Sequence, residues 1–363
     1  RWCLFHAFKF VFLPVRFCPN MGWIRGRLIG RGSFAAVSAA TIDASGHIVA
    51  VKSAELSKSE TLRKEHRILS SLRCPYVISQ LGHDITGEDG KVFYNLFLEF
   101  APGGSVLDAI RLHGGKLDEV TIRSYTENIL RGLDYLHAHG IVHCDIKCNN
   151  ILLSAEGPKI SDFGCAKIVV GIDRKERMSV SGTPAYMAPE TARGEEQSFP
   201  SDVWSLGCTV IAMATGKPPW GEFSEPVSAL YEIGFSDKVP EVPSFMSKEG
   251  RDFLRKCLRR DPRKRWSARM LLSHSFLLRG RDADIDVISP VSTLDPSMWI
   301  ALPEAAMEKS YSRSLEDGNG RMGGGNRRLQ VQLEETWLTV RGIQEDNTTE
   351  ETFACDSDWH NVC

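Results

Sequence analysis

The stretch that decides the fold spans residues 143–153 and reads His143-Cys144-Asp145-Ile146-Lys147-Cys148-Asn149-Asn150-Ile151-Leu152-Leu153. Its polar side chains Asp145, Lys147 and Asn150 are followed directly by an apolar run typical of a short buried strand. A rigid turn ahead of such a strand can aim the three groups at one reacting atom. Asp and Asn also occur in ordinary turns, where their side chains bond nearby backbone. The stretch alone leaves both interpretations open, and the order of its neighbours decides between them.

A glycine-rich segment lies upstream and reads Leu28-Ile29-Gly30-Arg31-Gly32-Ser33-Phe34-Ala35-Ala36-Val37. Glycine allows backbone amides to close over phosphate groups without a side chain in the way. Two glycines also fit an ordinary strand-turn-strand hairpin. A strand pattern follows the segment instead of a helix, which argues against a dinucleotide-binding unit.

A lysine and a glutamate follow at positions that favour an ion pair. Lys52 ends the strand pattern of residues 47–52. Glu65 lies in residues 61–72, whose apolar spacing predicts a helix. Both charges can equally be solvated surface groups, and Glu60 is a second possible partner for Lys52.

Further segments flank the opening stretch. Apolar spacing over residues 121–138 predicts a long helix that leads into it. A short hairpin separates it from Asp162-Phe163-Gly164, the polar residues 165–182 and then Thr183-Pro184-Ala185-Tyr186-Met187-Ala188-Pro189-Glu190. Residues 202–216 are apolar nearly all round, which predicts a helix in the middle of a lobe. Arg265 comes last in the series.

In this order, from Gly30 to about Phe276, the segments resemble the motifs of protein kinases. The resemblance implies an α+β, bilobal kinase domain over residues 21–279. Its small, mainly β N-lobe would cover residues 21–100, and its larger, mainly α C-lobe residues 101–279. The resemblance also implies an ion pair between Glu190 and Arg265, and an Asp202 side chain that braces the loop of residues 143–150.

The resemblance gives each polar group of the loop a role in phosphoryl transfer. Asp145 would accept the proton of the incoming hydroxyl, and Lys147 would neutralise charge on the transferred group. Lys52, fixed by Glu65, would clamp the α- and β-phosphates. The metal would be Mg²⁺, a hard ion that favours oxygen ligands, bound by Asn150 and Asp162.

ATP is the implied nucleotide. The backbone of Glu99 and Ala101 would bond the adenine edge, although the apolar residues around the ring fit an ordinary core equally well. The full implied set is Ile29, Gly30, Arg31, Gly32, Ser33, Val37, Ala50, Lys52, Glu99, Ala101 and Leu152. Thr183 together with Lys147 is the signature of serine/threonine kinases, which implies an enzyme that phosphorylates protein hydroxyls.

A finer resemblance, to plant mitogen-activated protein kinase kinase kinases, rests on Trp23-Ile24-Arg25-Gly26, Ser33-Phe34-Ala35, Cys144 and Gly182-Thr183-Pro184. It implies a mitogen-activated protein kinase kinase as the substrate, in stress or hormone signalling. The resemblance implies that residues 165–182 are the activation loop. Cys144 stands where most kinases carry an arginine that binds the phosphate of a phosphorylated activation loop. Because cysteine cannot bind a phosphate in this way, we expect weak dependence on loop phosphorylation.

Composition limits the kinds of binding partner and the cellular compartment that we expect for the protein. The net charge of -2 gives no basic field for nucleic acid or a membrane surface, and no apolar run is long enough to cross a bilayer. Ten cysteines without framework spacing favour a reducing compartment, the cytoplasm or the nucleus. Cys144, Cys148 and Cys165 are either small buried fillers or a redox switch.

The two ends of the chain differ from the rest. We expect Met21 to be the physiological start and residues 1–20 to be a non-native upstream extension. Glycine clusters predict that residues 280–363 form a flexible regulatory or docking tail, in which the apolar residues 337–340 either dock a regulator or are a stray patch.

The alternative function is a pseudokinase scaffold that binds signalling partners without phosphoryl transfer. Such a protein is expected to lack one of the groups Lys52, Asp145, Asn150 and Asp162. All four are present.

Overall fold

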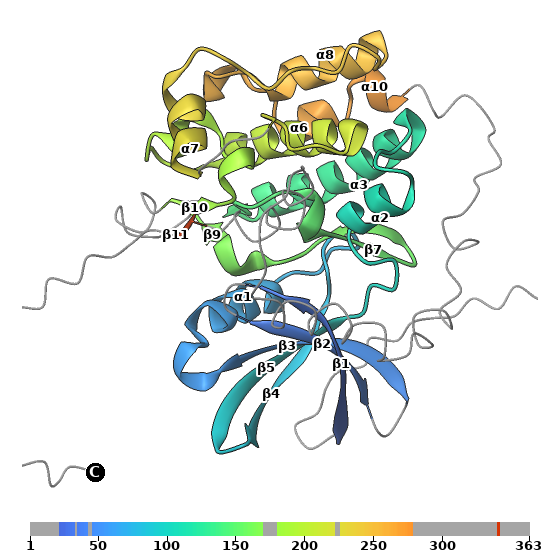
Figure 1. Cartoon of the computed structure of the whole chain (residues 1–363), viewed down its shortest axis with the longest axis vertical. Helices are drawn as coiled ribbons and strands as arrows, with labels where there is room; N and C mark the ends of the chain where they lie inside the picture. The colour runs from blue at the N-terminus through green and yellow to red at the C-terminus, as the bar shows by residue number, and fades with distance from the viewer. Residues whose placement is uncertain are drawn as a thin grey trace, which may run out of the picture.

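The computed structural model describes residues 22–32, 35–42, 46–169, 180–221, 226–278 and 340–341. The predicted extension over residues 1–20 lies outside this part of the chain, and so does the predicted tail apart from Val340 and Arg341. A β-sheet lobe and a helical lobe lie one against the other (Figure 1). The predicted α+β, bilobal fold is confirmed.

The small lobe is built on a five-stranded antiparallel sheet in the order β1-β2-β3-β5-β4. Successive side chains of β3 point to opposite faces: Val49 and Val51 pack with Phe97, whereas Ala50 joins the core that continues into the large lobe. Lys52 therefore points to the same face as Ala50. The strands are β1 (Trp23–Arg31), β2 (Ala36–Ile42), β3 (His47–Glu55), β4 (Gln80–Glu88) and β5 (Lys91–Glu99).

Helix α1 (Glu60–Ser70) follows a 3-10 turn over Leu56–Lys58 and contacts β3, β4 and β5. Its buried face consists of Leu62, Ile68 and Leu69, at the helical spacing seen in the sequence, together with the carboxylate of Glu65. The helix ends at Ser70, earlier than the predicted end at residue 72. The hydroxyl of Ser71 donates to the carbonyl of Ile68 and closes the last turn.

The large lobe is mainly helical, and every helix of the described residues is too short or too polar to span a bilayer. Helix α3 begins after Asp118, whose carboxylate accepts from the N–H of Thr121, and the chain turns beyond it at Gly140, with φ of 70°. The helices are α2 (Val106–Leu112), α3 (Glu119–Ala138), α5 (Pro189–Ala192), α6 (Phe199–Thr215), α7 (Pro226–Phe235), α8 (Lys248–Cys257), α9 (Ala268–Leu271) and α10 (Ser275–Leu278).

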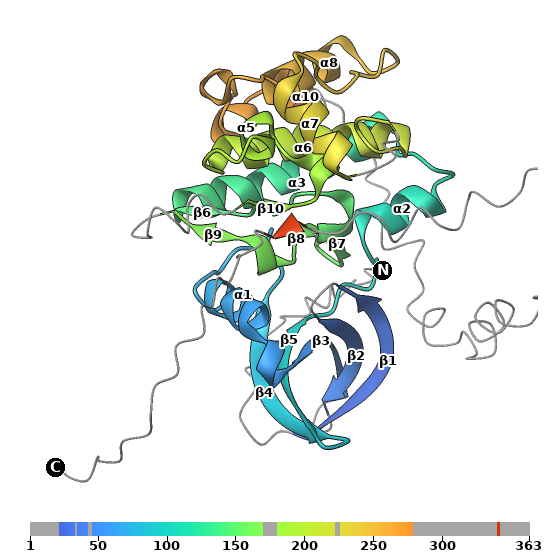
Figure 2. The ribbon, with the colours of Figure 1, turned by 60° about the vertical axis from the view of Figure 1, so that its left-hand side comes forward.

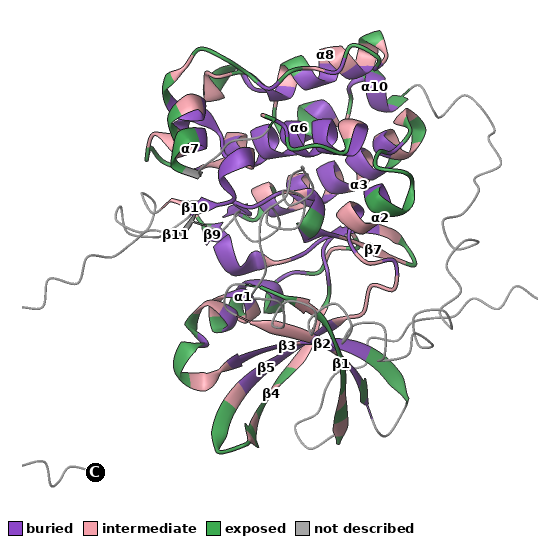
Figure 3. Ribbon diagram, in the orientation of Figure 1, coloured by how far each residue is buried: buried purple, intermediate pink, exposed green. Residues whose placement is uncertain are grey.

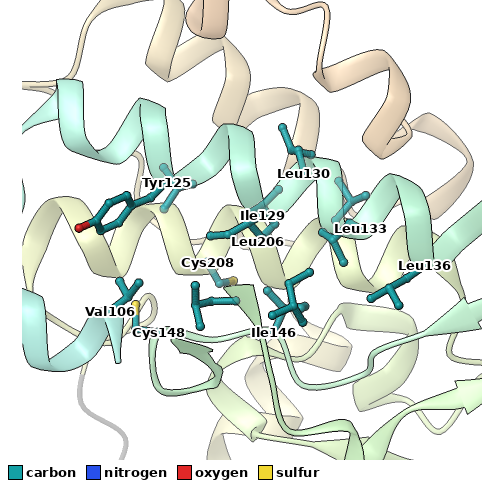
Figure 4. Packing of buried hydrophobic residues seen from close by; sticks show 14 of the residues in the cluster. Val106, Tyr125, Ile129, Leu130, Leu133, Leu136, Ile146, Cys148, Leu206 and Cys208 are labelled. Atoms are coloured by element: carbon teal, nitrogen blue, oxygen red, sulfur yellow. The ribbon is translucent and has the colours of Figure 1, made fainter. Parts of the chain in front are cut away.

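Helix α6 is the centre of this lobe and is buried along almost its whole length, as Figure 3 shows. Leu206 of α6 and Leu133 of α3 belong to one apolar cluster with Ile146 and Cys148 of the loop (Figure 4). Each fully buried leucine or isoleucine contributes about 1.5–3 kcal/mol relative to an exposed one. The loop that carries the polar groups is therefore anchored in the apolar core.

Short two-stranded ladders and turns place the remaining loops. Strand β6 (Ile141–Val142) pairs with β9 (Lys167–Ile168), and β7 (Ile151–Ser154) pairs with β8 (Gly157–Ile160). Strand β10 (Ser181–Gly182) pairs with β11 (Val340–Arg341), which lies beside it in Figure 2. The 3-10 turns of this lobe are Cys148–Asn150, Phe163–Cys165, Pro184–Tyr186 and Pro262–Lys264.

A buried ion pair joins two distant parts of the large lobe. The guanidinium of Arg265 donates to both carboxylate oxygens of Glu190 at 2.6 Å, and the side chains are 0% and 3% exposed. Ser201 donates a further hydrogen bond to Glu190. This pairing was predicted from the resemblance.

We expect Arg265→Met to lower the free energy of unfolding by about 3–5 kcal/mol, because it leaves the carboxylate of Glu190 buried without its partner. Urea unfolding measures the loss. The matched control is Arg263→Met, which removes an arginine that is 88% exposed and paired with Asp261. Equal stability of the two variants would contradict the prediction.

Candidate active site

The backbone of the loop over residues 143–150 is fixed by Asp202 at the start of α6. Its Oδ2 atom accepts from the N–H of His143 and its Oδ1 atom from the N–H of Cys144, both at 2.9 Å. Asp202 is fully buried, and His137 lies 2.9 Å from Oδ2. Cys144 has φ of 68°, which is uncommon for a residue with a side chain, so these contacts hold the loop in a constrained turn.

Both oxygens of the Asp145 carboxylate are engaged. Oδ2 accepts from the Asn150 side-chain amide and lies next to the Lys147 ammonium, each at 2.9 Å. Oδ1 accepts from the hydroxyl of Thr183 at 2.8 Å, and Lys147 also donates to that hydroxyl. A buried carboxylate in hydrogen-bond contact with an alcohol can accept its proton when the alcohol reacts.

A second cluster joins the lobes. The ammonium of Lys52 lies 2.6 Å from Glu65 Oε2 and 2.9 Å from Asp162 Oδ1. Glu65 also accepts from the N–H of Phe163 at 3.3 Å. The predicted Lys52–Glu65 pair is present, and the alternative partner Glu60 is the exposed first residue of α1.

The ionisation of this cluster follows from burial and pairing. Burial alone would lower the pKa of Lys52, but the carboxylates of Asp162 and Glu65 raise it above its ordinary value. Burial would raise the pKa of Asp162, yet the charge of Lys52 lowers it well below its usual range. Burial raises the pKa of Glu65, and Lys52 opposes that shift. At neutral pH the charged Lys52 ammonium therefore lies between Glu65 and an ionised Asp162.

Asp162 and Asn150 are the groups suited to a cation. Asp162 has φ of 61° and ψ of 75°, and its side chain remains 45% exposed. The amide nitrogen of Asn150 is bound to Asp145, which leaves the amide oxygen for a hard cation. The described residues contain no cluster of three His, Cys, Asp or Glu side chains able to bind a metal ion. A cation here would need oxygens from a bound phosphate, which fits a metal–nucleotide complex.

One cleft brings the predicted nucleotide-binding residues together. Its lining includes Lys147, Asn150 and Asp162 from the large lobe. Asp145 does not line it, but contacts Lys147 and Thr183, which do. Ser33 lies outside the described residues. From the predicted set, the cleft is lined by Ile29, Gly30, Arg31, Gly32, Val37, Ala50, Lys52, Glu99, Ala101 and Leu152, and also by Glu65.

Two side chains at the site were not foreseen. Lys159 of β8 donates to the Glu99 carboxylate at 2.6 Å, which ties the end of β5 to the large lobe. Gln197, between α5 and α6, bonds the backbone of Cys144 and Ser181. The partners of Lys159 and Gln197 are distant from them in the sequence, so only the folded chain reveals these contacts.

The cysteines around the site behave as small core residues. Cys144, Cys148 and Cys165 are all buried. Burial raises the pKa of the Cys144 thiol well above its ordinary value and that of Cys148 to about 12. Protonated, inaccessible thiols are poor nucleophiles, which favours the filler interpretation over the redox switch.

Comparisons with known proteins agree with this geometry. Residues 23–277 match the family model described as a protein kinase domain. Mitogen-activated protein kinase kinase kinase 17 of Arabidopsis thaliana is 47% identical over 302 residues, which cover 82% of this chain and 78% of the relative. Mitogen-activated protein kinase kinase kinase 18 of the same plant is 45% identical over 80% of this chain and 89% of its own length. Mitogen-activated protein kinase kinase kinase 20 is also 45% identical, over 88% of this chain and 100% of its own length.

We expect Lys52→Met to lower the free energy of unfolding by about 3–5 kcal/mol near pH 7, since it strands the buried carboxylate of Glu65. The loss should shrink as the pH falls from neutral toward about 4.3, the ordinary pKa of glutamate, and should be gone below it. Burial raises the pKa of Glu65, so in the variant the penalty exists above the unfolded pKa and disappears once both states are protonated.

Urea unfolding of both proteins between about pH 4 and pH 8 tests this expectation, within the range where only carboxylates and histidines titrate. The control is Lys58→Met, which removes an exposed lysine that precedes the same helix. A loss that does not vary with pH, or one no larger than in the control, would show that Lys52 does not neutralise Glu65.

Proposed function

Because this chain belongs to the protein kinase family, and within it to the mitogen-activated protein kinase kinase kinases, we propose that it phosphorylates the activation loop of a mitogen-activated protein kinase kinase. The chain is a serine/threonine protein kinase. The observation that carries the proposal is the 2.8 Å hydrogen bond from the Thr183 hydroxyl to Asp145 Oδ1, which puts a protein alcohol against the proposed general base.

The proposed mechanism assigns a task to each loop residue. Asn150 and Lys147 contact Oδ2 of Asp145, and Thr183 donates to Oδ1. Oδ1 has a second lone pair, with which it would orient a substrate hydroxyl and accept its proton. Lys147 lies beside that hydroxyl position and stabilises negative charge that develops there. Positioning of this kind supplies most of the catalysis in phosphoryl transfer, which needs little covalent help from the protein.

Protein kinases use ATP and a divalent metal, and we propose Mg²⁺ as the metal. ATP supplies the transferred group, and the metal neutralises phosphate charge. Lys52 would contact the phosphates, and Asn150 and Asp162 would contribute the oxygen ligands. Asp162 is suited to this task because it is ionised at neutral pH and nearly half of its side chain is accessible.

The substrate class is supported by the relatives' names and by the resemblance of the Thr183–Glu190 segment to kinase substrate-docking segments. We extend the proposal to stress or hormone signalling in the cytoplasm or nucleus. We also propose that the tail over residues 280–363 docks a regulator. Its residues Val340 and Arg341 pair with β10, next to Thr183, which would put a bound regulator close to the site.

Incubation with Mg·ATP and a panel of catalytically inactive mitogen-activated protein kinase kinases tests the proposal, with mass spectrometry to map the modified residues. We expect phosphate on serine or threonine of the activation loop, and at least about a hundredfold lower rate for Lys52→Met because it removes transition-state charge stabilisation. Equal incorporation by wild type and Lys52→Met would instead support the pseudokinase scaffold.

Activity should depend only weakly on phosphorylation of the activation loop, because Cys144 offers no cation for a phosphate. Phosphatase treatment, and the double variant Ser179→Ala, Ser181→Ala, should each retain most of the rate. Ser181 is 7% exposed in β10, whereas Ser179 lies outside the described residues. A drop of more than roughly tenfold, about 1.4 kcal/mol of barrier, would contradict the prediction.

A further inference from the structure

Gln197 lies in the link between α5 and α6 and is only 3% exposed. Its amide nitrogen donates to the carbonyl of Ser181 at 3.0 Å and to the carbonyl of Cys144 at 3.3 Å. Its amide oxygen accepts from the ammonium of Lys167 at 3.3 Å. One side chain therefore joins β10, the loop of residues 143–150 and β9.

The contacts match what a primary amide can offer. The nitrogen of a glutamine amide carries two N–H donors, and the oxygen is an acceptor. At Gln197 both donors have a backbone carbonyl within reach, and the oxygen has a buried ammonium. Because the surroundings are buried, water cannot easily replace a donor that is lost here, so loss of either N–H would cost the hydrogen bond that it makes.

The strand that Gln197 holds leads directly into the active site. Gly182 follows Ser181 and packs closely on the loop, since a Cβ atom at Gly182 would lie 2.4 Å from the Cys144 carbonyl oxygen. The next residue is Thr183, whose hydroxyl contacts Asp145 and Lys147. A shift of β10 away from the loop would move Thr183 and disturb the position of the reacting groups.

In a kinase that carries arginine at position 144, the contact between these two segments requires a phosphate. There, the arginine ties a phosphorylated activation loop to the catalytic loop, which in this chain is the loop of residues 143–150. Here Cys144 is 4% exposed, and its side chain packs in a small apolar cluster with Val142 and Cys165. In this chain, neutral hydrogen bonds from Gln197 join the activation segment to the catalytic loop, beside the contacts that Thr183 makes with Asp145 and Lys147.

We propose that Gln197 is a positioning residue that fixes the activation segment on the catalytic loop, and that this contact replaces the phosphate-dependent link. The proposal rests on the proposed kinase function. It differs from that function because it concerns how the active arrangement is maintained, and it can be tested by measurements that do not depend on phosphoryl transfer.

The sharpest variant is Gln197→Glu, which keeps the size of the side chain and an acceptor for Lys167 but removes both donors. Lys167 lies close enough to keep the new carboxylate charged. We expect kcat on the protein substrate to fall at least about tenfold. The Kd of an ATP analogue should stay within about twofold, because Gln197 does not line the nucleotide cleft. Unchanged kcat would overturn the proposal.

A second set of variants covers the case in which Gln197→Glu fails to fold. Lys167→Met keeps both amide donors and should retain kcat within about threefold, since their hydrogen bonds remain. The double variant Lys167→Met, Gln197→Met removes the donors without leaving a buried ammonium beside an apolar side chain, and should lose at least about tenfold in kcat. Equal kcat values for the single and the double variant would overturn the proposal.

Hydrogen exchange separates this inference from the proposed function. In the double variant, backbone amides in residues 181–186 should exchange faster than in Lys167→Met, while those of α3 should not change. Hydrogen exchange tests the role of Gln197 even if the protein phosphorylates no mitogen-activated protein kinase kinase. In that case the proposed function is refuted, but the proposal about Gln197 is not. Equal exchange in the two proteins would remove the basis for a positioning role of Gln197.

Discussion

The ammonium of Lys52 between the carboxylates of Glu65 and Asp162 is the interaction on which the site depends. It joins a strand and a helix of the small lobe to the segment that follows β8 in the large lobe. Buried charges are stable only when paired, so the buried Lys52 and Glu65 each require an opposite charge, and Lys52 also pairs with the more exposed Asp162. The cleft between the lobes therefore has a defined geometry only in the conformation that assembles this cluster.

In the large lobe, hydrogen bonds fix the position of the loop of residues 143–150. Asp202 accepts the N–H groups of His143 and Cys144, while Ile146 and Cys148 of the same loop pack in the apolar core. Backbone and side chains are thus constrained from both ends of the loop. Asp145 gains a precise orientation because its surroundings cannot rearrange without breaking buried contacts, which is the form of preorganisation that phosphoryl transfer requires.

Cys144, which replaces the arginine of most kinases, also affects how the active arrangement is held. An arginine at this site makes the active arrangement conditional, because its charge needs an anion. Cys144 instead sits protonated in an apolar cluster, and the neutral amide of Gln197 connects the neighbouring strands. Neutral hydrogen bonds between buried groups do not depend on a modification.

Much of the fold could be predicted because its signals are local or belong to ordered motifs. The helix of residues 119–138 follows from apolar spacing, with only its first residues missed. The bilobal architecture, the Lys52–Glu65 pair and the Glu190–Arg265 pair followed from the resemblance, which transfers long-range pairings that periodicity cannot supply. The nucleotide-binding set was predicted from the same resemblance, and its described members line one cleft.

By itself, the sequence determined which residues carry charge and which segments form the main helices and strands, because these depend on residue type and near neighbours. Only the tertiary structure decided that Lys159 bonds Glu99, that the thiols are buried, and that Gln197 reaches both Cys144 and Ser181. Such contacts join residues far apart in the chain and belong to no motif. They exist because the packed core brings those backbones within hydrogen-bond distance, which no local pattern encodes.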